Sequence, residues 1–316
     1  MDTVVFKVVE GVEIRADVYS ATDGQLGPAV LFFHGGALIT GDRSWIAPSL
    51  IKAMTTAGIV VVSVDYRLAP ETKLPLIVSD IEDAYEWIRG DGGSRFSVDP
   101  ERIAVVGGSA GGYLALLAGS VFHPTPRAVV SFYGYGDVTG PWYSTPDLFY
   151  NTLEPVAEGR ARSAVGTEVI SQAPMSQLND RHDFYVYCRQ QGTWPQEVCG
   201  HDPSDRGWYE PYEPLSNVTA NYPPTMLLHG EADTDVPIER SIQMAEQLDR
   251  HGVAHALVTN AKWEHAFDLT SDGAIVQAAI GSVTDFLTKH LAEPPHLQVI
   301  EPSWPAENHS LDVGPL

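Results

Sequence analysis

The stretch IAVVGGSAGGY, residues 103–113, places a serine among glycines directly after a run of apolar, β-forming residues. The apolar run predicts a buried strand, and the alanine-rich YLALLAGS that overlaps its end predicts a helix. Within it, GGSAG is a G-x-S-x-G motif at a strand-to-helix turn, where small residues let a sharp turn close and leave the serine oxygen protruding from the sheet edge. A phosphate-binding loop would need G-x-G-x-x-G or G-K-S/T, and neither pattern fits. We therefore interpret Ser109 as a nucleophile.

Short apolar runs alternate with segments of helical period along most of the chain. Such runs suit strands that are buried on both faces of a sheet. Strand alternating with helix predicts an α/β protein with a mainly parallel, doubly wound sheet. The half-exposed strand VEIRADVYS precedes this pattern. The expected strands are 29–34, 58–66, 102–107, 127–134 and 225–230, and the expected helices are 45–57, 78–90, 110–121, 238–251 and 273–290.

One segment breaks the alternation and divides the predicted core. Residues 137–221 mix many aromatic residues with prolines and charges over a length too great for a loop, which predicts an inserted cap. The core then consists of residues 1–136 and 222–291. The C-terminal tail, 292–316, is rich in proline and lacks periodicity, so we expect it to lie over the surface or to be partly disordered.

Composition argues against several classes of partner. The 316 residues include 41 acidic and 19 basic side chains, a formal charge of −22 that repels nucleic acid and anionic membrane surfaces. The N-terminus has no basic stretch followed by an apolar one, and no run approaches the ~18 apolar residues of a membrane span, so we expect a cytoplasmic protein. Cys188 and Cys199 are too few for a disulfide framework or a zinc site. We expect two ordinary thiols, with pairing left open, no metal and no cofactor.

A serine hydroxyl needs a base to become a nucleophile, and the base needs a carboxylate to orient it. On this type of sheet the chain order is serine, acid, histidine. His265 follows the strand predicted in HALVTNAKWEHAF (255–267) and so falls on the same sheet edge as the serine. In TMLLHGEADTDVP (225–237) we favour Asp233 as the acid because it stands at the apex of the loop, whereas Asp235 is expected to cap the next helix.

The stretch FFHGGALITGDRSW, residues 32–45, is suited to bind negative charge. It follows a central strand, and its small residues allow backbone N–H groups to face a ligand. Preorganised N–H donors of this kind stabilise the oxyanion of a tetrahedral intermediate, and losing one costs ~2.7 to 4 kcal/mol of barrier.

Five motifs, in order, resemble those of one known family. HGGA, DYRLAPE, GGSAGG, HGEADTDVP and EHAF are similar to the motifs of the hormone-sensitive-lipase-like and carboxylesterase branch of the α/β-hydrolases, over about residues 28–136 and 223–290. The resemblance implies the α/β-hydrolase fold with an inserted cap. It also implies oxyanion-hole donors at Gly36, Ala37 and Ala110, with Ala37 replacing the family's usual third glycine.

The same resemblance assigns structural roles to two further residues. His34 would be a hydrogen-bonding residue rather than a base. Arg67 would form an ion pair with a carboxylate of the following helix, for which Asp80 is the candidate.

The sequence thus predicts a cofactor-independent serine hydrolase that acts on a small-molecule carboxylic ester or lactone through an acyl-enzyme intermediate. Hydrolysis of an amide or peptide by the same residues is an alternative. A non-catalytic ligand receptor on the same fold is another, although His265 argues against it. Acyl length and oligomeric state are left open.

Overall fold

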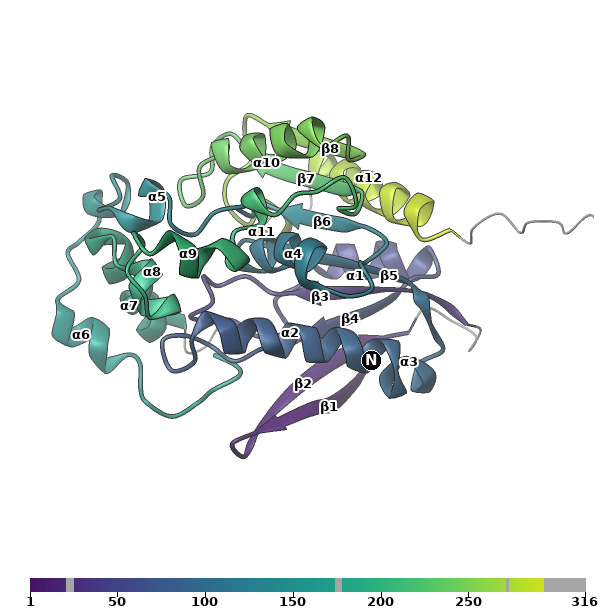
Figure 1. The fold of residues 1–316 in the computed structure, drawn as a ribbon, viewed down its shortest axis with the longest axis horizontal. Helices are drawn as coiled ribbons and strands as arrows, with labels where there is room; N and C mark the ends of the chain where they lie inside the picture. The colour runs from purple at the N-terminus through teal and green to yellow at the C-terminus, as the bar shows by residue number, and fades with distance from the viewer. Residues whose placement is uncertain (21–25, 174–177, 271–272, 293–316) are drawn as a thin grey trace, which may run out of the picture.

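A single, mainly parallel sheet of eight strands runs through the computed structural model, which describes residues 1–20, 26–173, 178–270 and 273–292 (Figure 1). The strands are β1 Asp2–Val9, β2 Val12–Tyr19, β3 Gly27–Phe33, β4 Val60–Val64, β5 Val98–Gly108, β6 Val129–Phe132, β7 Thr225–Gly230 and β8 His255–Asn260. Their order across the sheet is β1-β2-β4-β3-β5-β6-β7-β8. The pairs β1/β2 and β2/β4 are antiparallel, and all later neighbours are parallel.

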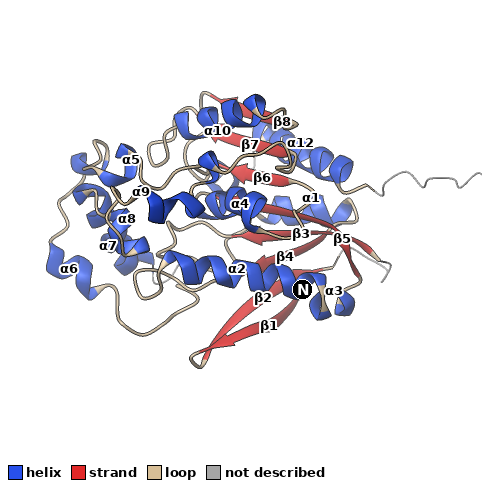
Figure 2. Cartoon of the chain, viewed as in Figure 1, coloured by secondary structure: helices blue, strands red, loops and turns tan. Residues whose placement is uncertain are grey.

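Helices cover both faces of the sheet (Figure 2). The core helices are α1 Pro48–Thr56, α2 Leu74–Arg89, α3 Asp91–Arg95, α4 Ala110–Val121, α10 Glu239–Arg250, α11 Phe267–Thr270 and α12 Ala274–His290. The buried apolar residues of α2, α4 and α10 share one core cluster with one face of the strands. Those of α1 and α12 share the second cluster with the other face. The predicted doubly wound α/β architecture is confirmed.

Most expected elements lie within a few residues of their predicted bounds. The largest differences are at β5 and α2, which both begin earlier than expected, β5 at Val98. β6 is shorter than expected at both ends. β6 ends at Phe132 because Tyr133 takes a positive φ of 39°, which an extended strand does not allow. α2 begins at Leu74, earlier than expected, with a proline in its first turn, where the missing N–H costs nothing. β1 was not expected, and it pairs as a hairpin with β2.

The aromatic-rich segment between β6 and β7 consists of short helices joined by loops. They are α5 Pro141–Ser144, η1 Tyr150–Thr152, α6 Glu158–Ser163, α7 Leu178–Gln191, α8 Trp194–Cys199, α9 Arg206–Tyr209, η3 Glu210–Tyr212 and η4 Pro214–Ser216. Figure 1 shows α5 to α8 beyond the ends toward which the parallel strands point. We keep the name cap for residues 137–221, whose boundaries stay a prediction.

Three other predictions concern the rest of the chain. Cys188 and Cys199 are both free and buried. In the part of the chain that the structure describes, no helix is long and apolar enough to cross a bilayer. The tail prediction falls almost entirely on residues 293–316, which lie outside the described residues.

Candidate active site

Ser109 occupies a strained turn between β5 and α4. Its φ of 56° and ψ of −122° are unfavourable for a residue with a side chain, and such strain is typical of functional positions. The flanking glycines are required because the turn leaves no room for a side chain at their positions. A Cβ at Gly107 would lie 2.2 Å from the carbonyl oxygen of Gly111, and one at Gly111 would lie 2.0 Å from that of Phe33. The turn therefore closes only with these glycines.

The three residues expected to act together lie in hydrogen-bonding contact. Ser109 Oγ is 3.0 Å from Nε2 of His265, and Nδ1 of His265 is 2.8 Å from Oδ2 of Asp233. Oδ1 of Asp233 accepts hydrogen bonds from the backbone N–H groups of Asp235 and Val236, at 2.8 and 2.9 Å. These bonds assign the Nδ1–H tautomer to neutral His265, so that its Nε2 lone pair faces the serine hydroxyl.

The electrostatics of the site favour a charged acid and a basic imidazole. Burial works against ionisation of Asp233, but its hydrogen bonds with His229 and His265 outweigh burial and hold its pKa far below the usual value. Burial alone would lower the pKa of His265. The carboxylates of Asp235, Asp233 and Asp268 outweigh that effect and raise the pKa of His265 above 6.5.

This shift predicts the pH dependence of turnover. His265 must be neutral to take the serine proton, so kcat/KM should rise with pH and level off above the raised pKa of the ring, with a midpoint above 6.5. The measurement is kcat/KM for a short-acyl ester across about pH 5 to 9. A flat profile, or a midpoint well below 6.5, would rule out His265 as the base.

The loop after β3 lies against the serine turn. A Cβ at Gly35 would be 3.2 Å from Cβ of Ser109. Gly36 and Ala37 line the same cavity as Ser109, and within the described ranges their backbone N–H groups have no hydrogen-bond acceptor. Ala37 has a φ of 56°, so alanine here is held in a conformation that glycine adopts more readily. Ala110 begins α4 next to Ser109 but is not among the residues that line the cavity.

Two cap side chains hold this loop, and neither contact was predicted from the sequence. Trp194 donates its indole N–H to the carbonyl oxygen of Ala37 at 3.0 Å. Arg181 donates to the carbonyl oxygen of Ile39 at 2.6 Å while it pairs with Glu71. Tryptophan and arginine in an aromatic-rich insertion carry no spacing signal that would have connected them to the loop.

Trp194→Phe tests whether the cap fixes the loop. The variant keeps an aromatic ring against Tyr143, whose ring stacks on Trp194 at 4.1 Å, but it removes the donor to Ala37. We expect kcat to fall about tenfold with little change in KM, because a less rigid loop offers poorer preorganised donors to the transition state. Steady-state kinetics on one ester measures this split. A change confined to KM would show that the contact serves ground-state binding instead.

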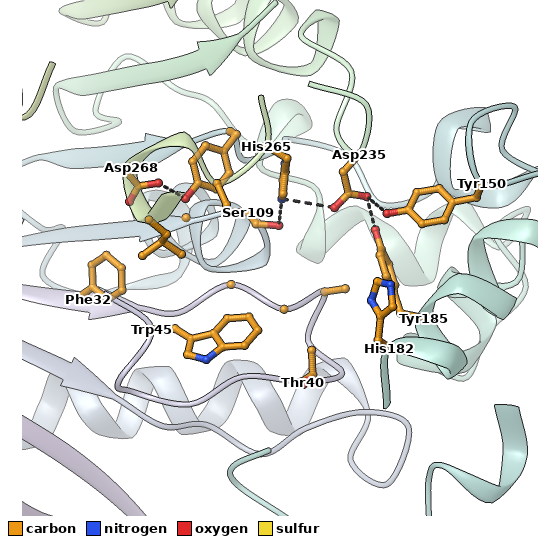
Figure 3. Close-up of a pocket in the computed structure, with 17 residues that line it drawn as sticks. Phe32, Thr40, Trp45, Ser109, Tyr150, His182, Tyr185, Asp235, His265 and Asp268 are labelled. Carbon is orange, nitrogen blue, oxygen red and sulfur yellow. Dashed lines mark hydrogen bonds and ion pairs between the residues drawn. The ribbon is translucent and has the colours of Figure 1, made fainter. Parts of the chain in front are cut away.

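The cavity above Ser109 has a volume of about 200 Å³ (Figure 3). Phe32, Trp45 and Leu269 provide apolar walls. A polar pair lies at one side, where the hydroxyl of Tyr133 donates to Oδ1 of buried Asp268. The cap contributes Tyr150, His182 and Tyr185 to the lining.

The expectation that Asp235 caps a helix is wrong. The N-cap of α10 is Ile238, and no side chain caps it. Instead, the Asp235 carboxylate turns toward the cap and accepts hydrogen bonds from Tyr150, Tyr185 and Arg189. A charged guanidinium forms strong, charge-assisted hydrogen bonds with a carboxylate, and Arg189 provides one here.

The structural roles implied by the family resemblance fit the observed contacts. Arg67 donates from Nε and Nη2 to both oxygens of Asp80, at 2.7 and 2.8 Å. His34 is buried, stacks on Tyr66 at 4.2 Å and donates from Nδ1 to the carbonyl oxygen of Gly35. Burial lowers the pKa of His34 to about 4, so it remains neutral.

The described residues form no group of three or more His, Cys, Asp or Glu side chains that could hold a metal ion. The predicted independence from metals and cofactors stays a prediction. The chemistry available at this site is nucleophilic attack by Ser109, proton transfer through His265 and stabilisation of an oxyanion by the loop.

The fold is that of the α/β-hydrolases. An α/β-hydrolase superfamily protein from Enterococcus faecalis has a similar structure, with a TM-score of 0.70 and 21% identity over 91% of this chain and 98% of that one. An esterase from Pyrobaculum calidifontis matches with a TM-score of 0.67 and 25% identity, over 91% of this chain and 84% of that one. Residues 16–248 match the model of the BD-FAE family. The chain therefore belongs to the BD-FAE family.

Curated relatives are much longer than this chain. The non-reducing polyketide synthase ausA of Aspergillus calidoustus is 26% identical over 351 aligned positions, which cover 92% of this chain but only 14% of that protein. The chain thus spans a small part of the length of the curated relatives it matches.

Proposed function

We propose that this protein is a serine hydrolase that cleaves a carboxylic ester or lactone through an acyl-enzyme intermediate, with Ser109, His265 and Asp233 as its catalytic triad. The observation that carries the proposal is the continuous chain of contacts from Ser109 Oγ through both nitrogens of His265 to Asp233. The strained backbone of Ser109, which presents its oxygen to the cavity, supports it independently. The esterase from Pyrobaculum calidifontis is consistent with ester chemistry on this fold.

The first half-reaction forms the acyl-enzyme. As Ser109 Oγ bonds to the substrate carbonyl carbon, its proton moves to Nε2 of His265, and the carbonyl electrons collect on the oxyanion. The N–H groups of Gly36, Ala37 and Ala110 stabilise that oxygen. Collapse of the intermediate breaks the bond to the leaving alcohol, which takes the proton from Nε2.

The second half-reaction releases the acid. Water gives a proton to Nε2 as its oxygen attacks the acyl carbon, and the bond to Ser109 Oγ then breaks as Oγ recovers that proton. Asp233 keeps its charge throughout and holds the imidazole in the productive tautomer.

The size of the cavity indicates a small substrate group. Its volume of about 200 Å³ falls below the ~300 to 1,000 Å³ of most drug-sized ligand sites. Its apolar walls suit the hydrocarbon part of a short acyl chain. We propose a short-acyl ester, or a lactone of similar size, as the substrate.

The experiment that tests this function is a panel of p-nitrophenyl esters from acetate to octanoate, with lactones and matched p-nitroanilides. We expect turnover of the short esters, with kcat/KM falling as the acyl chain outgrows the cavity. Faster cleavage of the anilides would favour the amide or peptide hydrolase. Saturable binding without turnover of any compound would favour the receptor.

A further inference from the structure

Asp235 lies on the opposite side of His265 from Asp233. Oδ2 of Asp235 is 3.3 Å from Nε2 of His265, the same nitrogen that faces Ser109. Figure 3 shows Asp235 beside His265 at the cavity. The imidazole therefore has a carboxylate at each nitrogen. A carboxylate in this place has no part in the triad chemistry described above.

The cap fixes the orientation of the Asp235 carboxylate. Its Oδ1 accepts hydrogen bonds from Nη1 of Arg189 at 2.7 Å and from the hydroxyls of Tyr150 at 2.9 Å and Tyr185 at 2.5 Å. Nη1 of Arg189 also donates to the Asp235 backbone carbonyl at 3.0 Å. These donors occupy Oδ1 and leave Oδ2 directed at His265.

Arg189 is itself held firmly. Its side chain is 1% exposed, and its Nη2 donates to Asp147 at 2.6 Å. Four aromatic rings surround the guanidinium, with centroids 4.7 to 5.8 Å from Cζ; they belong to Trp142, Tyr143, Tyr150 and Tyr185. Arg189 lies between the carboxylates of Asp147 and Asp235. The cluster of these three side chains therefore carries a net negative charge beside His265.

We propose that Asp235 is a second carboxylate of the active site, whose Oδ2 accepts the hydrogen bond from Nε2 of His265 once that ring is charged, and that Arg189 of the cap is the positioning residue that holds Asp235 there. This inference rests on the proposed function, since it concerns the same histidine. The chemical reason for a second carboxylate is that the proton that His265 has taken on Nε2 needs a hydrogen-bond acceptor. When Ser109 Oγ bonds to the acyl carbon it becomes a poor acceptor, and a buried charged N–H without a partner is costly. Oδ2 supplies an acceptor until the leaving oxygen takes the proton.

The groups that face His265 agree with this role. Asp233 and Asp235 come from the loop after β7, Asp268 comes from α11, and the ring of Tyr133 follows β6 at 4.7 Å from the imidazole centroid. Burial lowers the pKa of His265, but the charge of Asp235 and the hydrogen bond and charge of Asp233 outweigh it and raise that pKa. Arg189, behind Asp235, is the cation of this cluster.

The test is an NMR titration of His265, which needs no turnover. Its Cε1–H signal, assigned by its loss in His265→Gln, is followed from about pH 5 to 9 in wild type and in Asp235→Asn. We expect the pKa of His265 to fall by about one unit in Asp235→Asn. Arg189 keeps its partner Asp147 in this variant, so the fold should survive, and circular dichroism checks it.

Asp137→Asn is the matched control. Asp137 lies in the cap, where it pairs with Arg240 and contacts Trp142, so the variant removes one carboxylate charge without changing Asp235. The pKa of His265 should stay at its wild-type value in this control. An unchanged or raised pKa in Asp235→Asn would overturn the proposal.

Arg189→Met tests the positioning role. Methionine fills the aromatic cage but donates no hydrogen bond to Oδ1, so Oδ2 is no longer held at Nε2 and the pKa of His265 should fall toward its value in Asp235→Asn. A rise would show that Arg189 acts only as a nearby cation, and an unchanged pKa would show that Asp235 keeps its place without it; either result would overturn the role of Arg189. If wild type hydrolysed nothing while these shifts occurred, the proposed function would fail and the two-carboxylate arrangement would stand.

Discussion

Ser109→Ala is expected to lower kcat by roughly 10⁶-fold on a short-acyl ester, because no other group at the site can form the acyl-enzyme. The fold should be unaffected or slightly stabilised. Ser109 has a positive φ that alanine tolerates no worse, and its Oγ bonds only to His265 within the described part of the chain. The measurement is single-substrate kinetics at high enzyme concentration, alongside the thermal midpoint.

Ser120→Ala is the matched control for this prediction. Ser120 lies on α4, the helix that follows Ser109, and donates to the carbonyl oxygen of Leu117, away from the cavity. Its activity should match wild type. Retention of more than about a tenth of the wild-type rate by Ser109→Ala would exclude the nucleophile assignment.

Asp233→Asn is expected to lower kcat by about 10⁴-fold. An amide at this position cannot favour the Nδ1–H tautomer, and it also loses the charge that stabilises the imidazolium. Asp235→Asn should cost much less, about tenfold, because it leaves the tautomer intact. Parallel measurement of kcat in both variants decides the ranking. A larger loss in Asp235→Asn would move the orienting role to Asp235.

The sequence was informative where chemistry and local structure depend on the same short segment. Ser109 could be located because a G-x-S-x-G turn after an apolar strand requires small residues on both sides. His265 could be chosen among eleven histidines because parallel strands bring their following loops to one edge of the sheet.

The contacts that the cap makes with the site could not be predicted in the same way. Asp235 lies in the loop after β7, and Arg189 lies on α7, 46 residues away in the sequence. No periodic pattern in the sequence connects these two segments. A helix-cap role for Asp235 followed from local propensity, and the tertiary contact with a buried arginine outweighed it. In the sequence, Trp194 is one of many aromatic residues of the cap. Its contact with Ala37 could not be predicted because the two residues are 157 positions apart.

Covalent capture by an alkyl phosphonate reporter tests whether Ser109 is a nucleophile that His265 activates. Wild type, His265→Gln and Ser109→Ala are incubated with the probe near neutral pH, and the labelled peptide is identified by mass spectrometry. We predict one phosphonyl group on Ser109 in wild type, labelling at least about 100-fold slower in His265→Gln, and none in folded Ser109→Ala. Labelling of another residue in wild type, or equal rates with and without His265, would contradict this prediction.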